Sequence, residues 1–178
     1  MGLELEKEEQ KSADAILWTK EHPEEARTQL KEKILKAHPG NIHTLDDQRL
    51  SYLLEWLGDE YYENRLLVLL NLWGSKYFYP CKKYSDTNTH LISNDQELLI
   101  RLSGTVPGVI VISLRRKLCI GVYHCRLDPI CNSTMININN FIIDASKPTI
   151  ISDIQMVLFN THRKIYTPME YGCSTDDE

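Results

Sequence analysis

Arg115, Arg116 and Lys117 form the longest unbroken run of basic residues in the chain. A guanidinium can bind a phosphate through two parallel hydrogen bonds, so this run is a candidate anion site. His124 and Arg126 follow on the next apolar segment, two residues apart, and they share one face if that segment is a strand. The alternatives are an ordinary solvated turn for the basic run, and a half-buried, backbone-bonded side chain for His124.

The five cysteines raise the question of metal or disulfide chemistry. They are Cys81, Cys119, Cys125, Cys131 and Cys173. Their odd number and low density fit reduced thiols in a reducing compartment. The equal spacing of three of them, beside a histidine, suggests zinc, but structural zinc sites favour cysteine pairs roughly two to four residues apart. We therefore expect small buried hydrophobic residues, with no metal and no cofactor.

The common catalytic motifs are not found in the sequence. It has no G-x-S-x-G, no H-E-x-x-H, no G-x-x-x-x-G-K-[ST] and no glycine-rich dinucleotide turn. Cys81 and His90 could form a thiol–base pair, but nothing in the sequence brings them together. The chain is therefore expected not to be an enzyme, and a small hydrolase or transferase is the alternative.

The first half of the chain has the pattern of amphipathic helices. Pro23 opens a segment in which Ala26, Leu30, Ile34 and Ala37 recur at helical spacing. A second helix is predicted over the leucines of residues 50–57, with Thr44 and Asp47 as a capping box, and a third over the apolar block 66–73. We expect residues 1–76 to form a helical region.

The second half changes to β-branched and aromatic residues from residue 77 onward, which predicts an α+β domain over residues 77–170. A short helix is predicted over residues 94–102 and a buried central strand over 109–114. Further strands are predicted over 118–127 and 135–139, and residues 141–143 extend the second of these or begin another. A final helix is predicted over 152–160. The acidic residues 171–178 are expected to be a disordered tail.

Composition narrows the class of protein. The chain has 178 residues, of which 42% are hydrophobic and 25% charged, as in globular proteins. Its longest apolar runs are far shorter than the roughly 20 residues of a spanning helix, so no membrane insertion is expected. A net charge of -5 argues against general nucleic-acid binding. Residues 1–9 lack the features of a secretory signal, and Glu6 replaces the Ser or Thr of a myristoylation site, so a cytoplasmic location is expected.

Residues 91–168 resemble an SH2 (Src-homology 2) domain, the module that binds phosphotyrosine peptides. Residues 92–99, ISNDQELL, are similar to the first helix of that family, and residues 109–112 to its central strand. Residues 119–123 look like the next strand, and residues 149–159 like the second helix. The resemblance implies a central antiparallel sheet flanked by two helices, preceded here by the helical region.

The resemblance also implies a binding site. The family's central strand ends in an arginine that binds the phosphate, and an ungapped match puts Ser113 at that place. Arg115, two residues further on the same face, would then supply the charge, with additional contacts from the turn that follows. The family often has a histidine beside the phosphotyrosine ring. The implied phosphotyrosine-binding residues are Ser113, Arg115, Arg116, Lys117, His124 and Arg126.

The expected partner is therefore a tyrosine-phosphorylated protein or peptide. The Ile- and Asn-rich segment 136–143 and the acidic C-terminal residues resemble those of SH2-bearing effectors from intracellular bacteria such as Legionella. That resemblance implies delivery into a host cell by a type IV route and action on host signalling. The alternative is an α+β interaction or assembly subunit without phosphotyrosine binding, in which the Leu-rich helices between Leu50 and Trp73 form the partner surface.

Overall fold

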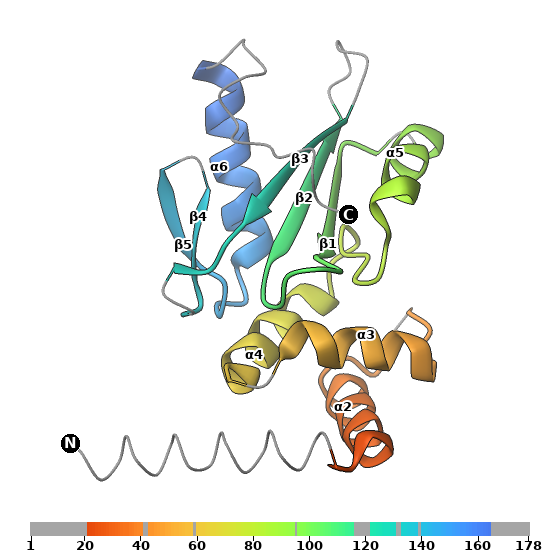
Figure 1. The fold of residues 1–178 in the computed structure, drawn as a ribbon. Helices are drawn as coiled ribbons and strands as arrows, with labels where there is room; N and C mark the ends of the chain where they lie inside the picture. Colours follow the sequence, from red (N-terminus) through yellow and green to blue (C-terminus); the bar gives the residue numbers. More distant parts are fainter. Residues whose placement is uncertain are drawn as a thin grey trace, which may run out of the picture.

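The computed structural model describes residues 21–40, 43–58, 60–94, 96–115, 122–130, 133–138 and 140–164. In these ranges four helices precede two small antiparallel sheets, and one helix follows them (Figure 1). The α+β class predicted from the sequence is confirmed. None of the described helices has the length and apolarity needed to cross a bilayer.

The first described helix, α2, spans Pro23–Ala37. Pro23 stands at the start of the helix, where a missing N–H is tolerated, and acidic residues fill the first turn, where the helix dipole favours them. Ala26, Leu30 and Ile34 form the predicted buried stripe. Ala37, the predicted fourth member, is exposed at the end of the helix.

Helices α3 and α4 span Asp47–Leu57 and Tyr62–Trp73. Both were predicted, but the capping box at Thr44 is wrong. The residue directly before α3 is Asp46, whose carboxylate accepts a hydrogen bond from the backbone N–H of Arg49 at 2.8 Å. A side chain in this position reaches the free amides of the first turn, whereas Thr44 stands two residues too early.

The main sheet contains β1 (Leu98–Leu102), β2 (Ile110–Arg115) and β3 (Val122–Leu127), with β2 in the centre. The predicted buried central strand is thereby confirmed. The predicted helix over residues 94–102 is wrong, because helix α5 spans Tyr84–Ser93 and the following apolar run is strand β1. All five residues of β1 are buried, and its backbone groups pair with β2. A short, continuous apolar run has no period that separates strand from helix.

The second sheet is a hairpin of β4 (Met135–Ile138) and β5 (Phe141–Asp144). The first strand was predicted, and the segment after it begins a second strand instead of extending the first. The last helix, α6, spans Ile150–Lys164 and covers the predicted final helix. Upstream of α5, Phe78 forms a parallel bridge with Ile100, which fastens the start of this half of the chain to the sheet.

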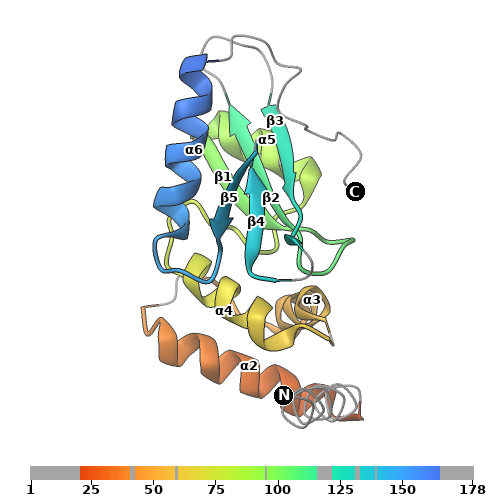
Figure 2. The same cartoon turned by 90° about the vertical axis from the view of Figure 1, so that its left-hand side faces the viewer.

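Helices α5 and α6 lie on opposite sides of the main sheet, and α2 to α4 lie beneath its lower end (Figures 1 and 2). One hydrophobic cluster joins helices α2 to α4 and α6 to the strands. It contains Leu30 and Ile34 of α2, the buried leucines of α3 and α4, alternate residues of the sheet, and Ile154 of α6. The helical region therefore packs against the sheet through a shared core.

Candidate functional site

The sheet face that packs against α5 carries polar side chains on all three strands. In one row across the sheet, Leu99 of β1 is opposite Ser113 of β2, which is opposite His124 of β3. In a second row, Val111 of β2 lies between Arg101 of β1 and Arg126 of β3. Residues directly opposite one another in antiparallel strands share a face. Arg101, Ser113, His124 and Arg126 therefore share this face, which we call the α5 face. The opposite face contributes its residues to the hydrophobic cluster.

His124 is held between β2 and α5. Its Nδ1 lies 2.7 Å from Oγ of Ser113, and its Nε2 lies 3.2 Å from Oδ1 of Asn88. An amide oxygen only accepts, so Nε2 carries a proton, and in the neutral ring Nδ1 accepts from the Ser113 hydroxyl. Ser113 is 0% exposed. Its hydroxyl therefore orients the imidazole and is not accessible to a substrate as a nucleophile.

Arg101 stands in the middle of β1 and is 0% exposed. Its Cζ lies 5.9 Å from the centroid of the Tyr84 ring, and the same ring lies 4.5 Å from the ring of His124. Arginine is rarely buried completely, because desolvating a charge is costly. The Tyr84 ring thus contacts both the buried guanidinium of Arg101 and the imidazole of His124.

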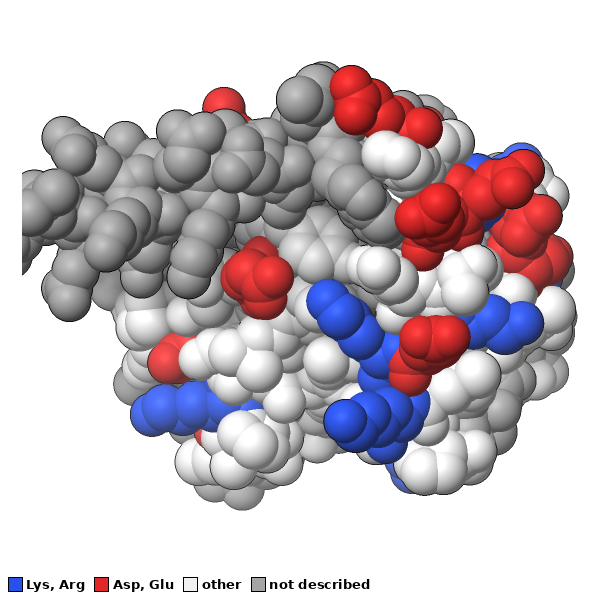
Figure 3. Space-filling model, turned by 90° about the horizontal axis from the view of Figure 1, so that it is seen from below, with Lys and Arg blue, Asp and Glu red and all other residues white. Residues whose placement is uncertain are grey.

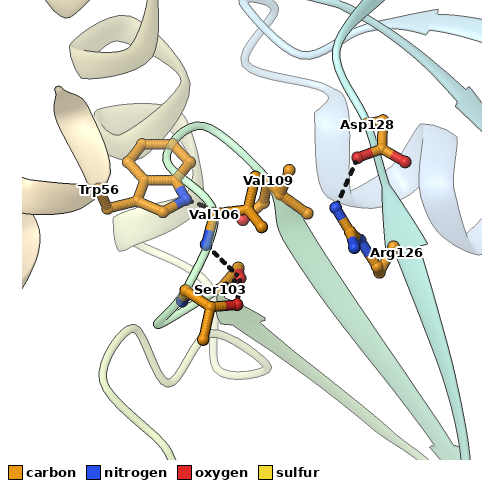
Figure 4. Close-up of polar contacts among 7 residues, drawn as sticks. Trp56, Ser103, Val106, Val109, Arg126 and Asp128 are labelled. Carbon is orange, nitrogen blue, oxygen red and sulfur yellow. Dashed lines mark hydrogen bonds and ion pairs between the residues drawn. The ribbon is translucent and has the colours of Figure 1, made fainter. Parts of the chain in front are cut away.

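The loop 103–109, between β1 and β2, is organised by its first residue. Oγ of Ser103 accepts hydrogen bonds from the backbone N–H of Thr105 at 3.3 Å and of Val106 at 3.1 Å (Figure 4). It also lies 3.3 Å from Oγ1 of Thr105. Ser103 follows Arg101 by two residues, so the hydroxyl groups lie at the end of the strand that carries the buried guanidinium.

Two of the other predicted site residues, Arg115 and Arg126, lie on strands β2 and β3. Arg126 is half-buried, and its Nη2 lies 3.2 Å from Oδ1 of Asp128 (Figure 4). Arg115 is half-buried at the end of β2, and its Nη1 donates to the carbonyl oxygen of Leu91 at 3.2 Å. Arg116 and Lys117, the first part of the predicted strand 118–127, and the tail 171–178 lie outside the described residues.

Sequence analysis missed Arg101. The segment that contains it was interpreted as a helix, in which a single arginine is an ordinary surface residue. The available signal was one arginine inside the otherwise apolar run Leu98–Leu102, because a strand buried on both faces has no exposed position for it.

A cavity of about 340 Å³ lies near the beginning of α5. It is lined by residues of the α3 start, the end of α4 and the segment before α5, among them Arg49, Trp73, Tyr79, Cys81 and Lys83. Burial raises the pKa of Cys81 to about 12, so this thiol stays protonated and is a poor nucleophile. His90, its proposed partner, contacts the ring of Tyr79 and lies 3.2 Å from Oε1 of Gln96.

Metal ligands do not gather in the part of the chain that the structure describes. No group of three or more His, Cys, Asp or Glu side chains could hold an ion there. Cys125 is a buried free thiol on β3, while Cys119 and Cys131 are outside the described residues.

The lower surface of the molecule mixes both signs of charge. Lysine and arginine side chains lie beside aspartate and glutamate side chains in this view (Figure 3). This face does not form the continuous basic surface that follows a nucleic-acid backbone.

Comparison with models of protein families, with curated proteins and with solved structures finds no match for the chain. The site is therefore interpreted from its geometry. The guanidinium groups of Arg101 and Arg126 are hydrogen-bond donors on the α5 face, whereas the Nε2–H of His124 is already bonded to Oδ1 of Asn88. Donors gathered beside an aromatic ring suit an anionic group attached to a planar ring.

Proposed function

We propose that the chain binds phosphotyrosine peptides through an SH2-like site on the α5 face. The observation that carries this proposal is the buried guanidinium of Arg101, beside Tyr84 and at the start of loop 103–109. A dianionic phosphate needs charge-assisted hydrogen bonds, and an arginine can provide two in parallel.

The order of the elements supports the proposal, with a shift in register. In the SH2 family the arginine-bearing strand follows the first helix. Here the helix is α5 and the strand after it is β1, so Arg101 falls at the place of the family's arginine instead of Ser113. Ser113 then stands on the neighbouring strand, where it orients His124.

Burial of Arg101 favours phosphotyrosine over phosphoserine. Arg101 is 0% exposed, as is Ser113, so a phosphate contacts its guanidinium only after the side chains that cover it move aside. The phenol ring of a phosphotyrosine supplies more length for this approach than the short side chain of a phosphoserine. The half-buried ring of Tyr84, which packs against His124, keeps some accessible surface on which the ligand ring can pack.

The alternative, an assembly subunit with a Leu-rich partner surface, has less support. Most large apolar side chains between Leu50 and Trp73 are buried in the hydrophobic cluster. Leu67 is the one large hydrophobic residue of that segment that the described structure leaves exposed, at 46%. A single exposed leucine is common on monomeric proteins.

The test is fluorescence polarisation with a degenerate peptide pool that carries a central phosphotyrosine. The unphosphorylated pool and the phosphoserine pool are the comparisons. We expect binding of the phosphotyrosine pool alone, and at least about tenfold weaker binding by Arg101→Lys, which keeps the charge and loses the fork. Arg49→Lys on α3 is the matched control and should bind as wild type. Equal binding of all three pools would reject the proposed function.

A further inference from the structure

We infer that helix α3 holds loop 103–109 in its phosphate-binding conformation, so that Tyr52 and Trp56 are positioning residues for a site outside α3. This inference rests on the proposed function, since it assigns the loop a ligand. The helical region then acts as part of the binding module.

Both ends of the loop are hydrogen-bonded to α3. The hydroxyl of Tyr52 donates to the carbonyl oxygen of Leu102 at 2.9 Å, at the end of β1. Nε1 of Trp56 donates to the carbonyl oxygen of Val109 at 2.8 Å, where the loop joins β2 (Figure 4). The carbonyl oxygen of Trp56 accepts from the backbone N–H of Gly108 at 3.0 Å.

These contacts fix the loop ends and leave its tip accessible. Trp56 is 2% exposed, so its bond to Val109 is protected from water. Gly104, Thr105 and Pro107 are exposed. A small cavity of about 90 Å³ separates α3 from the tip. A loop anchored at both ends and open at its tip is suited to receive a ligand without first being ordered.

Anchoring has a consequence for affinity. The amides of Thr105 and Val106 donate to Oγ of Ser103, two residues after Arg101, and these bonds fix the positions of the Ser103 and Thr105 hydroxyls. Rigid placement of donors reduces the entropy lost on binding. Loss of the α3 contacts should therefore weaken binding without removing any group that touches the ligand.

The experiment compares Trp56→Phe and Tyr52→Phe with matched controls. Each variant keeps the ring and removes one donor. Trp73→Phe and Tyr62→Phe are equivalent changes in α4. We expect about three- to tenfold weaker binding of the phosphotyrosine pool by the α3 variants, with wild-type affinity in the controls at similar melting temperature.

Amide hydrogen exchange at Thr105 and Val106 is the second readout. Exchange of these two amides should be faster in Trp56→Phe than in Trp73→Phe. If Trp56→Phe does not fold, Tyr52→Phe replaces it in this comparison. If wild type binds no phosphopeptide, the proposed function fails, and exchange still decides whether α3 holds the loop. Unchanged exchange, or equal affinity in α3 variants and controls, would overturn the inference.

Discussion

Arg65 of α4 lies against Gly108 so closely that a Cβ on Gly108 would stand 2.5 Å from Nε of Arg65. Gly108 also has a φ of 79°, in the left-handed region that favours glycine. Nη1 of the same arginine donates to the carbonyl oxygen of Leu57 at 2.9 Å. One guanidinium thus joins the end of α3 to the end of loop 103–109, beside the hydrogen bonds of Trp56.

Gly108→Ala should destabilise the protein by about 1–2 kcal/mol, because it combines an unfavourable φ with displacement of Arg65. Urea unfolding measures the change. Gly40→Ala is the control, since nothing lies within 4 Å of its would-be Cβ. Adding Arg65→Ala should recover part of the loss. If the two glycine variants are equally stable, the close approach of Arg65 has no energetic weight.

Asn88→Asp should weaken phosphopeptide binding by about tenfold or more. The new carboxylate would stand where Oδ1 of Asn88 now lies, 3.2 Å from Nε2 of His124, and would repel a phosphate bound on the α5 face. The stability of the folded protein should not fall, because the new carboxylate at position 88 would stabilise the protonated imidazole of His124. Fluorescence polarisation and thermal melting are the measurements. Thr89→Asp, exposed on the same helix, adds an equal charge and should have little effect.

Asp128→Asn should strengthen phosphopeptide binding a few-fold. It removes the carboxylate that holds Nη2 of Arg126 at 3.2 Å, and a partly exposed ion pair contributes only about 0–1 kcal/mol to stability. Arg126→Gln should weaken binding by about tenfold. In the double variant, Asp128→Asn should have no effect on affinity. If Asp128→Asn still increases phosphopeptide affinity in the Arg126→Gln background, the effect of Asp128 does not depend on its ion pair with Arg126.

The elements that sequence analysis predicted have a clear hydrophobic period or flanking turn residues. Helix α2 has three core residues at helical spacing after a proline, and the hairpin has alternating residues in β4. Strand β1 has no hydrophobic period, and the turn residues Ser103 and Gly104 that follow it would end a helix as well as a strand. Its acidic preceding residues favour a helix, and only pairing with β2 decides in favour of a strand.

The site was predictable only in part, for the same reason. His124 and Arg126 could be placed on one face by strand parity, and the ladder register agrees with that placement. The position of Arg101 depends on β1 being a strand. The contacts of Tyr52 and Trp56 with the loop join residues about fifty positions apart in the chain, which no local pattern indicates.

Asp144 should make the stability of the hairpin dependent on pH. Its Oδ1 accepts hydrogen bonds from the hydroxyl of Ser146 at 2.6 Å, the amide of Ser146 at 2.9 Å and the hydroxyl of Thr134 at 2.9 Å. Bonds from Ser146, then Thr134 and the charge of Lys147, lower the pKa of this carboxyl. The folded protein therefore holds the proton less tightly than the unfolded chain, in which the carboxyl pKa is about 3.9.

This stabilisation is complete above the unfolded pKa and is lost as the pH falls through the lower, folded pKa. Asp144→Asn keeps Oδ1 as an acceptor and removes the charge. It should lower the melting temperature by about 2–4 °C at pH 7, and the difference from wild type should close as the pH falls below about 4. Asp86→Asn, an exposed change on α5, is the control and should show a smaller difference at pH 7. A deficit in Asp144→Asn that stays constant down to pH 2 would mean that the shape of the amide, and not the lost charge, causes it.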